Sequence, residues 1–147
     1  MLEVFIAYTK GSNIEELEAT LNSWDLDGLE PVAIECGLKK FQIIRRVTAE
    51  NLSHGNYVLT DLGTAPVEED FGQRAEKCLA DYPTVGMVEL ASGVDVFVCR
   101  KGIVDKWPTP RTESYMKEHR EAYLLKGYET SVCPEIHYRH LVGLLPS

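Results

Sequence analysis

The sequence has no long apolar run and no excess of basic residues, and each absence excludes a class of protein. No apolar segment approaches the ~20 residues that a membrane-spanning helix needs, so we expect no membrane span. The net charge of −8 argues against nucleic acid as a partner, because binding its phosphates requires clustered lysine and arginine. The first residues also lack the basic region that opens a signal peptide, so we expect no secretion signal.

Cysteine is scarce and shows no metal-binding or redox spacing. The four cysteines form no C-x-x-C pair, and three of them lie inside apolar runs. We therefore expect buried, reduced thiols in a cytoplasmic protein, with two disulfides as the alternative that the even count leaves open. His137 and His140 are too close in sequence for the H-x₃₋₅-H half of a zinc site.

The composition is that of an ordinary globular domain. Of the 147 residues, 44% are hydrophobic and 26% are charged, a balance that permits a substantial buried core. The chain contains no internal repeat, low-complexity segment or linker, so we expect a single domain spanning residues 1–147. The oligomeric state stays open, and a homo-oligomer is one of the options.

Apolar periodicity predicts strands and helices in alternation. The predicted strands are residues 2–8, 30–36, 57–60, 84–90, 94–99 and 130–133, and the predicted helices are residues 14–24, 41–53, 67–82 and 111–126. Ser12 and Glu15 have the spacing of a capping box, and residues 61–66 have the composition of a turn. The order predicts a three-layer α/β/α fold with a mixed, mostly parallel sheet, whose strand pair around Gly93 is antiparallel.

Ligands of open α/β sheets bind beyond the carboxyl ends of the strands, which directs attention to three segments. They are the loop from Tyr8 to Ser12, the turn that begins at Asp61, and the approach to His140. Gly11 and Ser12 precede a predicted helix, as in phosphate-binding loops, although the pattern GxxxxGK[ST] is absent. The alternative for this first loop is an ordinary βα turn with a capping serine.

The segment Gly55 to Pro66, GNYVLTDLGTAP, resembles the G-E-Y-strand-D-x-D-x-x-P segment of family-2-type glycosyltransferases with the GT-A fold. Further similarities to this family follow in the same order. They are residues 95–101, residues 103–107, Gly127-Tyr128, Pro134-Glu135 and His140. The resemblance covers residues 49–141 and depends on the order and spacing of these motifs together.

The resemblance implies a nucleotide-diphospho-sugar transferase that moves a sugar from a nucleotide-diphosphate donor to a hydroxyl acceptor. In that family the acidic turn and the closing histidine hold Mg²⁺ or Mn²⁺ against the diphosphate, which places Asp61 and His140 as metal ligands. The donor side would comprise Tyr8, Arg45 or Arg46, Asp61 and Gly63. Arg45 and Arg46 are adjacent, so only one can face the diphosphate.

The sequence departs from the family pattern where the second strand ends, since Glu35-Cys36-Gly37 stands in place of the acidic signature that helps to hold the nucleotide, and at two further functional positions. Gly63 stands at the second acidic position and has no ligand atom. The position of the catalytic base falls on Tyr115 and Met116, so Glu113 and Glu118 are the nearest candidates for this role. Two alternatives therefore stay open, a catalytically degenerate binding or interaction module on the same fold and an ordinary doubly wound phosphate-ligand enzyme that uses Ser12.

Overall fold

The computed structural model describes residues 2–36, 55–90, 92–102, 121 and 123–141. The predicted helix over residues 41–53 lies outside the described residues, as does most of the helix predicted over residues 111–126.

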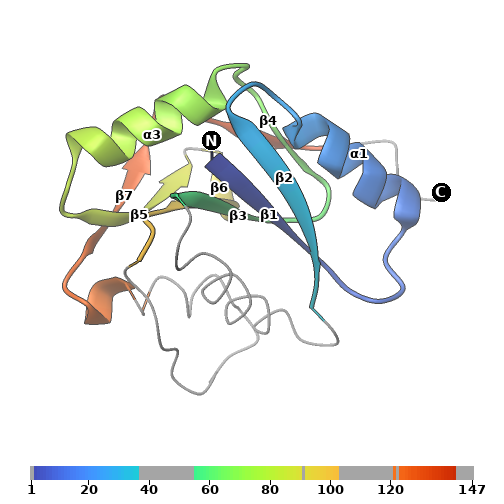
Figure 1. Cartoon of the computed structure of the whole chain (residues 1–147), viewed down its shortest axis with the longest axis horizontal. Helices are drawn as coiled ribbons and strands as arrows, with labels where there is room; N and C mark the ends of the chain where they lie inside the picture. The colour runs from blue at the N-terminus through green and yellow to red at the C-terminus, as the bar shows by residue number, and fades with distance from the viewer. Residues whose placement is uncertain (1, 37–54, 91, 103–120, 122, 142–147) are drawn as a thin grey trace.

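A six-stranded mixed sheet organises the described part of the chain, in the order β2-β1-β3-β6-β5-β7 (Figure 1). Its strands are β1 (Leu2–Tyr8), β2 (Leu29–Glu35), β3 (Tyr57–Asp61), β5 (Val85–Leu90), β6 (Gly93–Cys99) and β7 (Glu129–Cys133). β6 runs antiparallel to its neighbours β3 and β5, whereas the other pairings are parallel. The prediction of an α/β fold with a mostly parallel sheet and an antiparallel pair at Gly93 is therefore confirmed.

A second, two-stranded sheet pairs β4 (Thr64–Pro66) with β8 (Tyr138–His140). Sequence analysis predicted a turn over residues 61–66 and no strand after Cys133, and both expectations are wrong. The turn is confined to Leu62 and Gly63, and the chain then enters β4. The proline in β4 is tolerated because a two-stranded sheet leaves each strand one edge on which no amide donor is required.

Two helices, α1 (Ile14–Trp24) and α3 (Phe71–Asp81), lie on the same face of the sheet (Figure 1). They meet where the rings of Trp24 and Phe71 pack edge to face, with centroids 5.1 Å apart. Around them lies an apolar cluster that includes Val4, Val58 and Val98 from the sheet. In the part of the chain that the structure describes, no helix is long and apolar enough to span a membrane.

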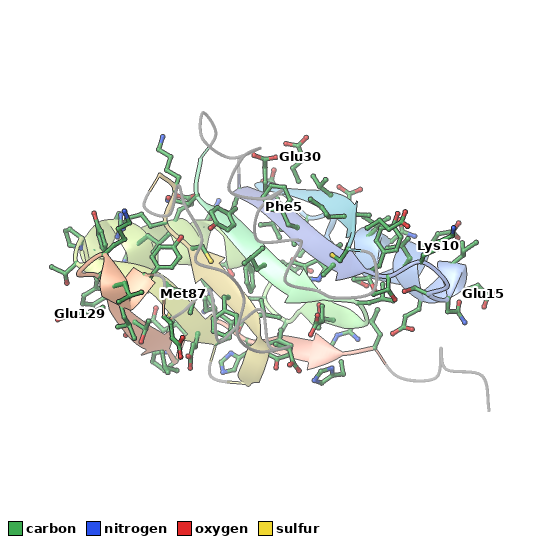
Figure 2. All side chains as sticks on the ribbon, turned by 90° about the horizontal axis from the view of Figure 1, so that it is seen from below. Phe5, Lys10, Glu15, Glu30, Met87 and Glu129 are labelled. Atoms are coloured by element: carbon green, nitrogen blue, oxygen red, sulfur yellow. The ribbon has the colours of Figure 1, made fainter. Side chains whose placement is uncertain are left out.

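The opposite face of the sheet carries a second apolar cluster. Figure 2 looks onto this face, where Phe5 of β1 and Met87 of β5 are labelled. Tyr123, from the short helical stretch before Gly127, is fully buried in this cluster. The Tyr123 hydroxyl lies 3.2 Å from that of Tyr57, so both buried polar groups have a partner. Among the described residues, α1 and α3 cover one face of the sheet, and the short stretch that contains Tyr123 packs on the other.

The ends of the helices differ from the sequence-based expectation. The side chain of Asn13, not Ser12, accepts hydrogen bonds from the amides of Glu15 and Glu16 and caps α1. Ser12 instead bonds to Thr9 and closes the loop after β1. Val67 is exposed and lies outside α3, which begins at Phe71 with Asp70 as its N-cap residue.

Arg100, which follows β6, ties three elements together. Its guanidinium donates to the carbonyl oxygens of Leu79 and Tyr82 at the end of α3, and to that of Val85 in β5. Arginine satisfies carbonyl groups that the last helical turn cannot pair internally. The side chain therefore fastens α3 to the sheet.

All four cysteines are free thiols, and Cys36, Cys99 and Cys133 are buried. The expectation of buried thiols is confirmed for these three, whereas Cys78 is half-buried. The alternative of two disulfides is not observed.

We expect Gly86→Ala to destabilise the protein by about 1–3 kcal/mol, because the new methyl overpacks a filled core. A Cβ at residue 86 would lie 2.3 Å from Cδ1 of Tyr123 and 2.9 Å from Cβ of Tyr128. Urea unfolding would measure the loss. Ser131→Ala, on an exposed position of β7, is the control and should change stability by less than about 0.5 kcal/mol. An unchanged midpoint for Gly86→Ala would contradict this packing.

Candidate functional site

The carboxyl ends of β1 and β3 meet at one edge of the sheet because these strands run parallel. Asp61 is the last residue of β3 and lies opposite Ala7 of β1. β6 runs antiparallel to β3, so its first residues reach the same edge. Asp95 precedes Val96, which is the partner of Thr60. Asp61 and Asp95 therefore occupy neighbouring places on adjacent strands.

The ribbon of β4 and β8 brings His140 to this edge. Thr64 pairs with His140, and the amide of Leu141 donates a 2.8 Å hydrogen bond to the carbonyl of Gly63. The turn after Asp61 thus leads directly into the strand that holds His140. Two segments far apart in the sequence, the acidic turn and the C-terminal strand, lie side by side.

Three side chains from β6 and β8 interact at this edge. Nε2 of His140 lies 3.5 Å from Oδ2 of Asp95. The Tyr138 hydroxyl accepts a 3.2 Å hydrogen bond from the Asp95 amide and donates one of 3.4 Å to Oδ2 of Asp95. His140 and Asp95 keep 62% and 43% of their side chains exposed, so a ligand can reach both.

A buried hydroxyl network fixes the acidic turn from the inside. Thr64 Oγ1 lies 2.5 Å from Thr60 Oγ1, accepts a 3.2 Å hydrogen bond from Nε1 of Trp24 and donates one of 3.0 Å to the carbonyl of Asp61. Thr20 Oγ1 accepts a 2.9 Å hydrogen bond from the Gly63 amide. Because a hydroxyl offers one donor and two acceptor sites, these contacts can be satisfied together.

The backbone at position 63 favours glycine over an acidic residue. Gly63 has a φ of +83°, in the left-handed region that favours glycine, and a Cβ there would lie 2.6 Å from Oε1 of Glu16. The carboxylate of Glu16, from the first turn of α1, therefore lies where the second acid of the family motif would project. The backbone of this turn explains the departure that the sequence shows at Gly63.

The described residues fit a cation that enters with its ligand better than a permanent protein-bound metal. Asp61 and His140 provide a carboxylate and an imidazole at one edge, which are donors that Mn²⁺ or Mg²⁺ accepts. Yet no group of three or more His, Cys, Asp or Glu residues that could hold a metal ion occurs among the described residues. A diphosphate would have to supply the remaining oxygen ligands.

The other predicted site residues are placed as follows. Tyr8 is the last residue of β1, is half-buried, and accepts a 2.8 Å hydrogen bond at its carbonyl from the Cys36 amide. Ser12 is engaged with Thr9, which gives it a structural role in the first loop. The predicted residues that lie outside the described ranges are Arg45, Arg46, Glu113 and Glu118.

Sequence reasoning missed the three residues that surround the predicted pair, namely Glu16, Asp95 and Tyr138. Glu16 lies on the polar side of a predicted helix, and Asp95 was quoted only as part of a strand. Their proximity depends on pairings between distant segments, and a local pattern gives at most the face of a strand on which a residue lies. The alternation of Asp95 with the buried Val96 was the available signal, since it predicts that residue 95 faces away from the layer that Val96 packs against.

Glu68 and His137 fix the start of β8. The Glu68 carboxylate accepts a 2.9 Å hydrogen bond from the backbone amide of His137. One of its oxygens also lies 2.5 Å from the ring Nδ1 of His137. Burial raises the pKa of Glu68, but the hydrogen bonds and the charge of His137 outweigh burial and leave the pKa lowered. The ionised carboxylate is thus the form that the folded protein favours.

We expect Thr64→Val to destabilise the protein by about 1–3 kcal/mol, because the buried Nε1–H of Trp24 loses its acceptor. Thr64→Ser retains the hydroxyl and should lose less. Urea unfolding of both variants gives the comparison. Equal losses would contradict the expectation, because the methyl removed in Thr64→Ser would then contribute as much stability as the hydroxyl removed in Thr64→Val.

Glu68→Gln should lower stability at pH 7 by about 1 kcal/mol, a value reduced for the partial exposure of the pair. Because the folded-state pKa of Glu68 is lowered, its contribution is present above the unfolded pKa of about 4.3 and disappears as pH falls through the folded pKa. The difference between wild type and variant, measured by urea unfolding, should therefore shrink below about pH 4.5. Glu69→Gln, at the exposed neighbour, is the control, and a difference independent of pH would contradict the assignment.

The fold has a counterpart among solved structures. The chain resembles A197 from STIV, a viral protein, with a TM-score of 0.64. The two sequences are 11% identical, and the match covers 97% of this chain and 86% of A197. No protein-family model and no curated protein matches the chain. At this level of identity the similarity shows the fold alone, an α/β fold with a six-stranded, mostly parallel sheet.

Proposed function

We propose that the chain is a small GT-A-type glycosyltransferase that moves a sugar from a nucleotide-diphosphate donor to a hydroxyl acceptor. The observation that carries this proposal is the meeting of the Asp61 turn and His140 at the carboxyl edge of a mostly parallel sheet. The glycosyltransferase resemblance assigns cation contacts to these two residues. They come from opposite ends of the matched region and lie at one exposed edge.

The chemical demand on such a site is stabilisation of the departing nucleoside diphosphate. A divalent cation bound to the diphosphate would neutralise charge that develops on the leaving group. Asp61 and His140 would coordinate the Mg²⁺ or Mn²⁺ ion that is bound to the donor diphosphate. The diphosphate oxygens complete a set of ligands that the described protein residues do not complete alone.

The roles of diphosphate contact, nucleotide contact and catalytic base are assigned from the sequence resemblance alone. Arg45 or Arg46 would contact the diphosphate, because the planar guanidinium fits its oxygens, and Tyr8 would border the nucleotide. Glu118 or Glu113 would take the proton from the acceptor hydroxyl as it attacks the sugar.

A second candidate function is a non-catalytic nucleotide-sugar-binding or interaction module on the same fold. The absence of an acid at position 63 favours it, as does the lack of a three-ligand group among the described residues. A fold can be retained after catalytic activity is lost. Binding of a nucleotide sugar without turnover would therefore distinguish this module from a transferase.

A panel of UDP- and GDP-sugars with Mn²⁺ tests both candidates. We expect one donor to raise the melting temperature by several degrees, since a ligand at 100 times its Kd adds about 2.7 kcal/mol. Asp61→Asn and His140→Ala should remove most of this shift, whereas Asp27→Asn, in the exposed turn before β2, should not.

Release of free nucleotide from the bound donor distinguishes the candidates. Stabilisation with release supports the transferase, and stabilisation without release, with or without an acceptor, supports the binding module. If no nucleotide sugar stabilises the protein, both candidates are wrong.

A further inference from the structure

β2 and β7 form the two outer edges of the six-stranded sheet (Figure 1). Within the described part of the chain, β7 pairs with β5 only and β2 pairs with β1 only. The outer edge of a strand presents amide and carbonyl groups that can pair with another chain, and proteins commonly block it with proline, lysine or a bulge. The two edges of this sheet differ in this respect.

The outer edge of β2 is blocked by Pro31. The amide of Cys36, directly after β2, donates a 2.8 Å hydrogen bond to the carbonyl of Tyr8 in β1. Amide groups alternate in direction along a strand, so the nitrogen of residue 31 points away from β1. Proline has no amide hydrogen, and a further strand beside β2 would lack a donor there.

The outer edge of β7 carries no such block. The amide of Glu129 donates a 2.9 Å hydrogen bond to the carbonyl of Thr84, just before β5. By the same alternation, the amide and carbonyl groups of Thr130 and Val132 point away from β5. The strand reads ETSVC, without proline or lysine, and the side chain of Val132 is 54% exposed. β7 therefore offers two outward-facing residues for backbone pairing.

α3 does not cover this edge. Ser131 pairs with Val88, which belongs to the apolar cluster beneath α1 and α3, so the Ser131 side chain lies on the helical face of the sheet. There it remains exposed. A cavity of about 280 Å³ separates α3 from β7, and Tyr82, Ser131 and Val132 are among the residues that line it. The helix thus leaves β7 accessible on this face.

The surface beside β7 is electrically balanced. The charged residues that line the cavity are two cations, Arg74 and Lys77, and two carboxylates, Asp81 and Glu135. Lys77 and Asp81 form an ion pair at 3.3 Å. The whole chain carries a net charge of −8, which opposes self-association in general. Two copies of this neutral surface can meet without that repulsion.

The sequence of β7 is complementary to itself. Antiparallel pairing of two copies about Ser131 places Thr130 opposite the second copy's Val132, and each of these two pairs would exchange both backbone hydrogen bonds. Thr130 and Val132 have the β-branched side chains that favour such pairing. The two Glu129 side chains would lie about 13 Å apart along the strands, farther than the Debye length of about 8 Å at physiological salt.

We propose that β7 is a dimer interface, at which two copies of the chain join their sheets edge to edge about a two-fold axis at Ser131. The open edge permits an added strand. The charge balance and the self-complementary register favour a second copy over an unrelated extended peptide. The interface is independent of the proposed function, because β7 contributes no residue to the edge that carries Asp61 and His140.

The molar mass of the full chain in solution tests the interface. In light scattering from about 1 µM to 1 mM, the wild-type mass should rise from 16.5 kDa toward twice that value. Val132→Pro removes an outward-facing donor from each copy, so the affinity of the dimer should fall about tenfold or more. Val132→Thr keeps the amide and the shape of the side chain, and this control should dimerise as the wild type does.

A single-cysteine cross-link tests the register. In a Cys78→Ser background, which removes the half-buried thiol, Ser131→Cys should form a disulfide-linked dimer when oxidised glutathione is added. Residues directly opposite in a non-hydrogen-bonded pair have Cα atoms about 4.5 Å apart, within the range of a disulfide. Thr130→Cys in the same background is the control and should cross-link little, because its counterpart is the second copy's Val132.

Three results would overturn the proposal. The first is a wild type that stays monomeric throughout, which would leave the edge to an extended segment of another protein. The second is a dimer that neither Val132→Pro nor Val132→Lys weakens. Val132→Lys keeps every backbone donor and serves if the proline variant does not fold. The third is cross-linking of Ser131→Cys that does not exceed that of Thr130→Cys, which would exclude a two-fold axis at residue 131.

Discussion

The contact between α1 and the turn after Asp61 is the constraint on which the rest of the site depends. Glu16, Thr20 and Trp24 follow at intervals of one helical turn and face the same short segment. Thr20 binds the amide of Gly63, and Trp24 binds the hydroxyl of Thr64. These are buried polar contacts, which are directional and costly to leave unmade. They specify one conformation for the turn, and the conformation of the turn determines where β4 begins.

From β4 the same constraint reaches His140. Since β8 pairs with β4 residue by residue, the position of Thr64 fixes that of the histidine. The candidate site is therefore assembled by backbone pairing, and side-chain contacts such as Asp95 with His140 refine it. Functional sites on strands, supported by contacts from neighbouring side chains, keep their geometry better than sites on loops.

Local periodicity was enough to predict the elements with long, regular patterns. The strands β1, β5 and β6 and the helix α1 lie within one residue of their expected bounds, because apolar spacing reflects which face is buried. The three-residue strands β4 and β8 could not be predicted, since so short a segment carries no period and forms only through its distant partner. The cap of α1 was misassigned for a related reason, because Ser12 and Asn13 both suit an N-cap and the contact of Ser12 with Thr9 decides between them.

The candidate site was predictable as far as it follows a linear motif. Asp61 and His140 could be named from order and spacing, whereas Asp95, Tyr138 and Glu16 could not, because their proximity is a product of sheet topology. Gly63 shows the reverse case. The sequence shows a missing acid there, and the left-handed φ of the backbone shows why glycine is favoured at this position.

The pairing of β4 with β8 also bears on the order of events in folding. It joins segments from the middle and the end of the described chain, so closing it carries a large loss of chain entropy that earlier contacts must offset. We therefore expect the sheet around β1 and β3 to be established before His140 reaches its place. The edge of the sheet that carries His140 would then be completed only after the strands it lies beside have paired.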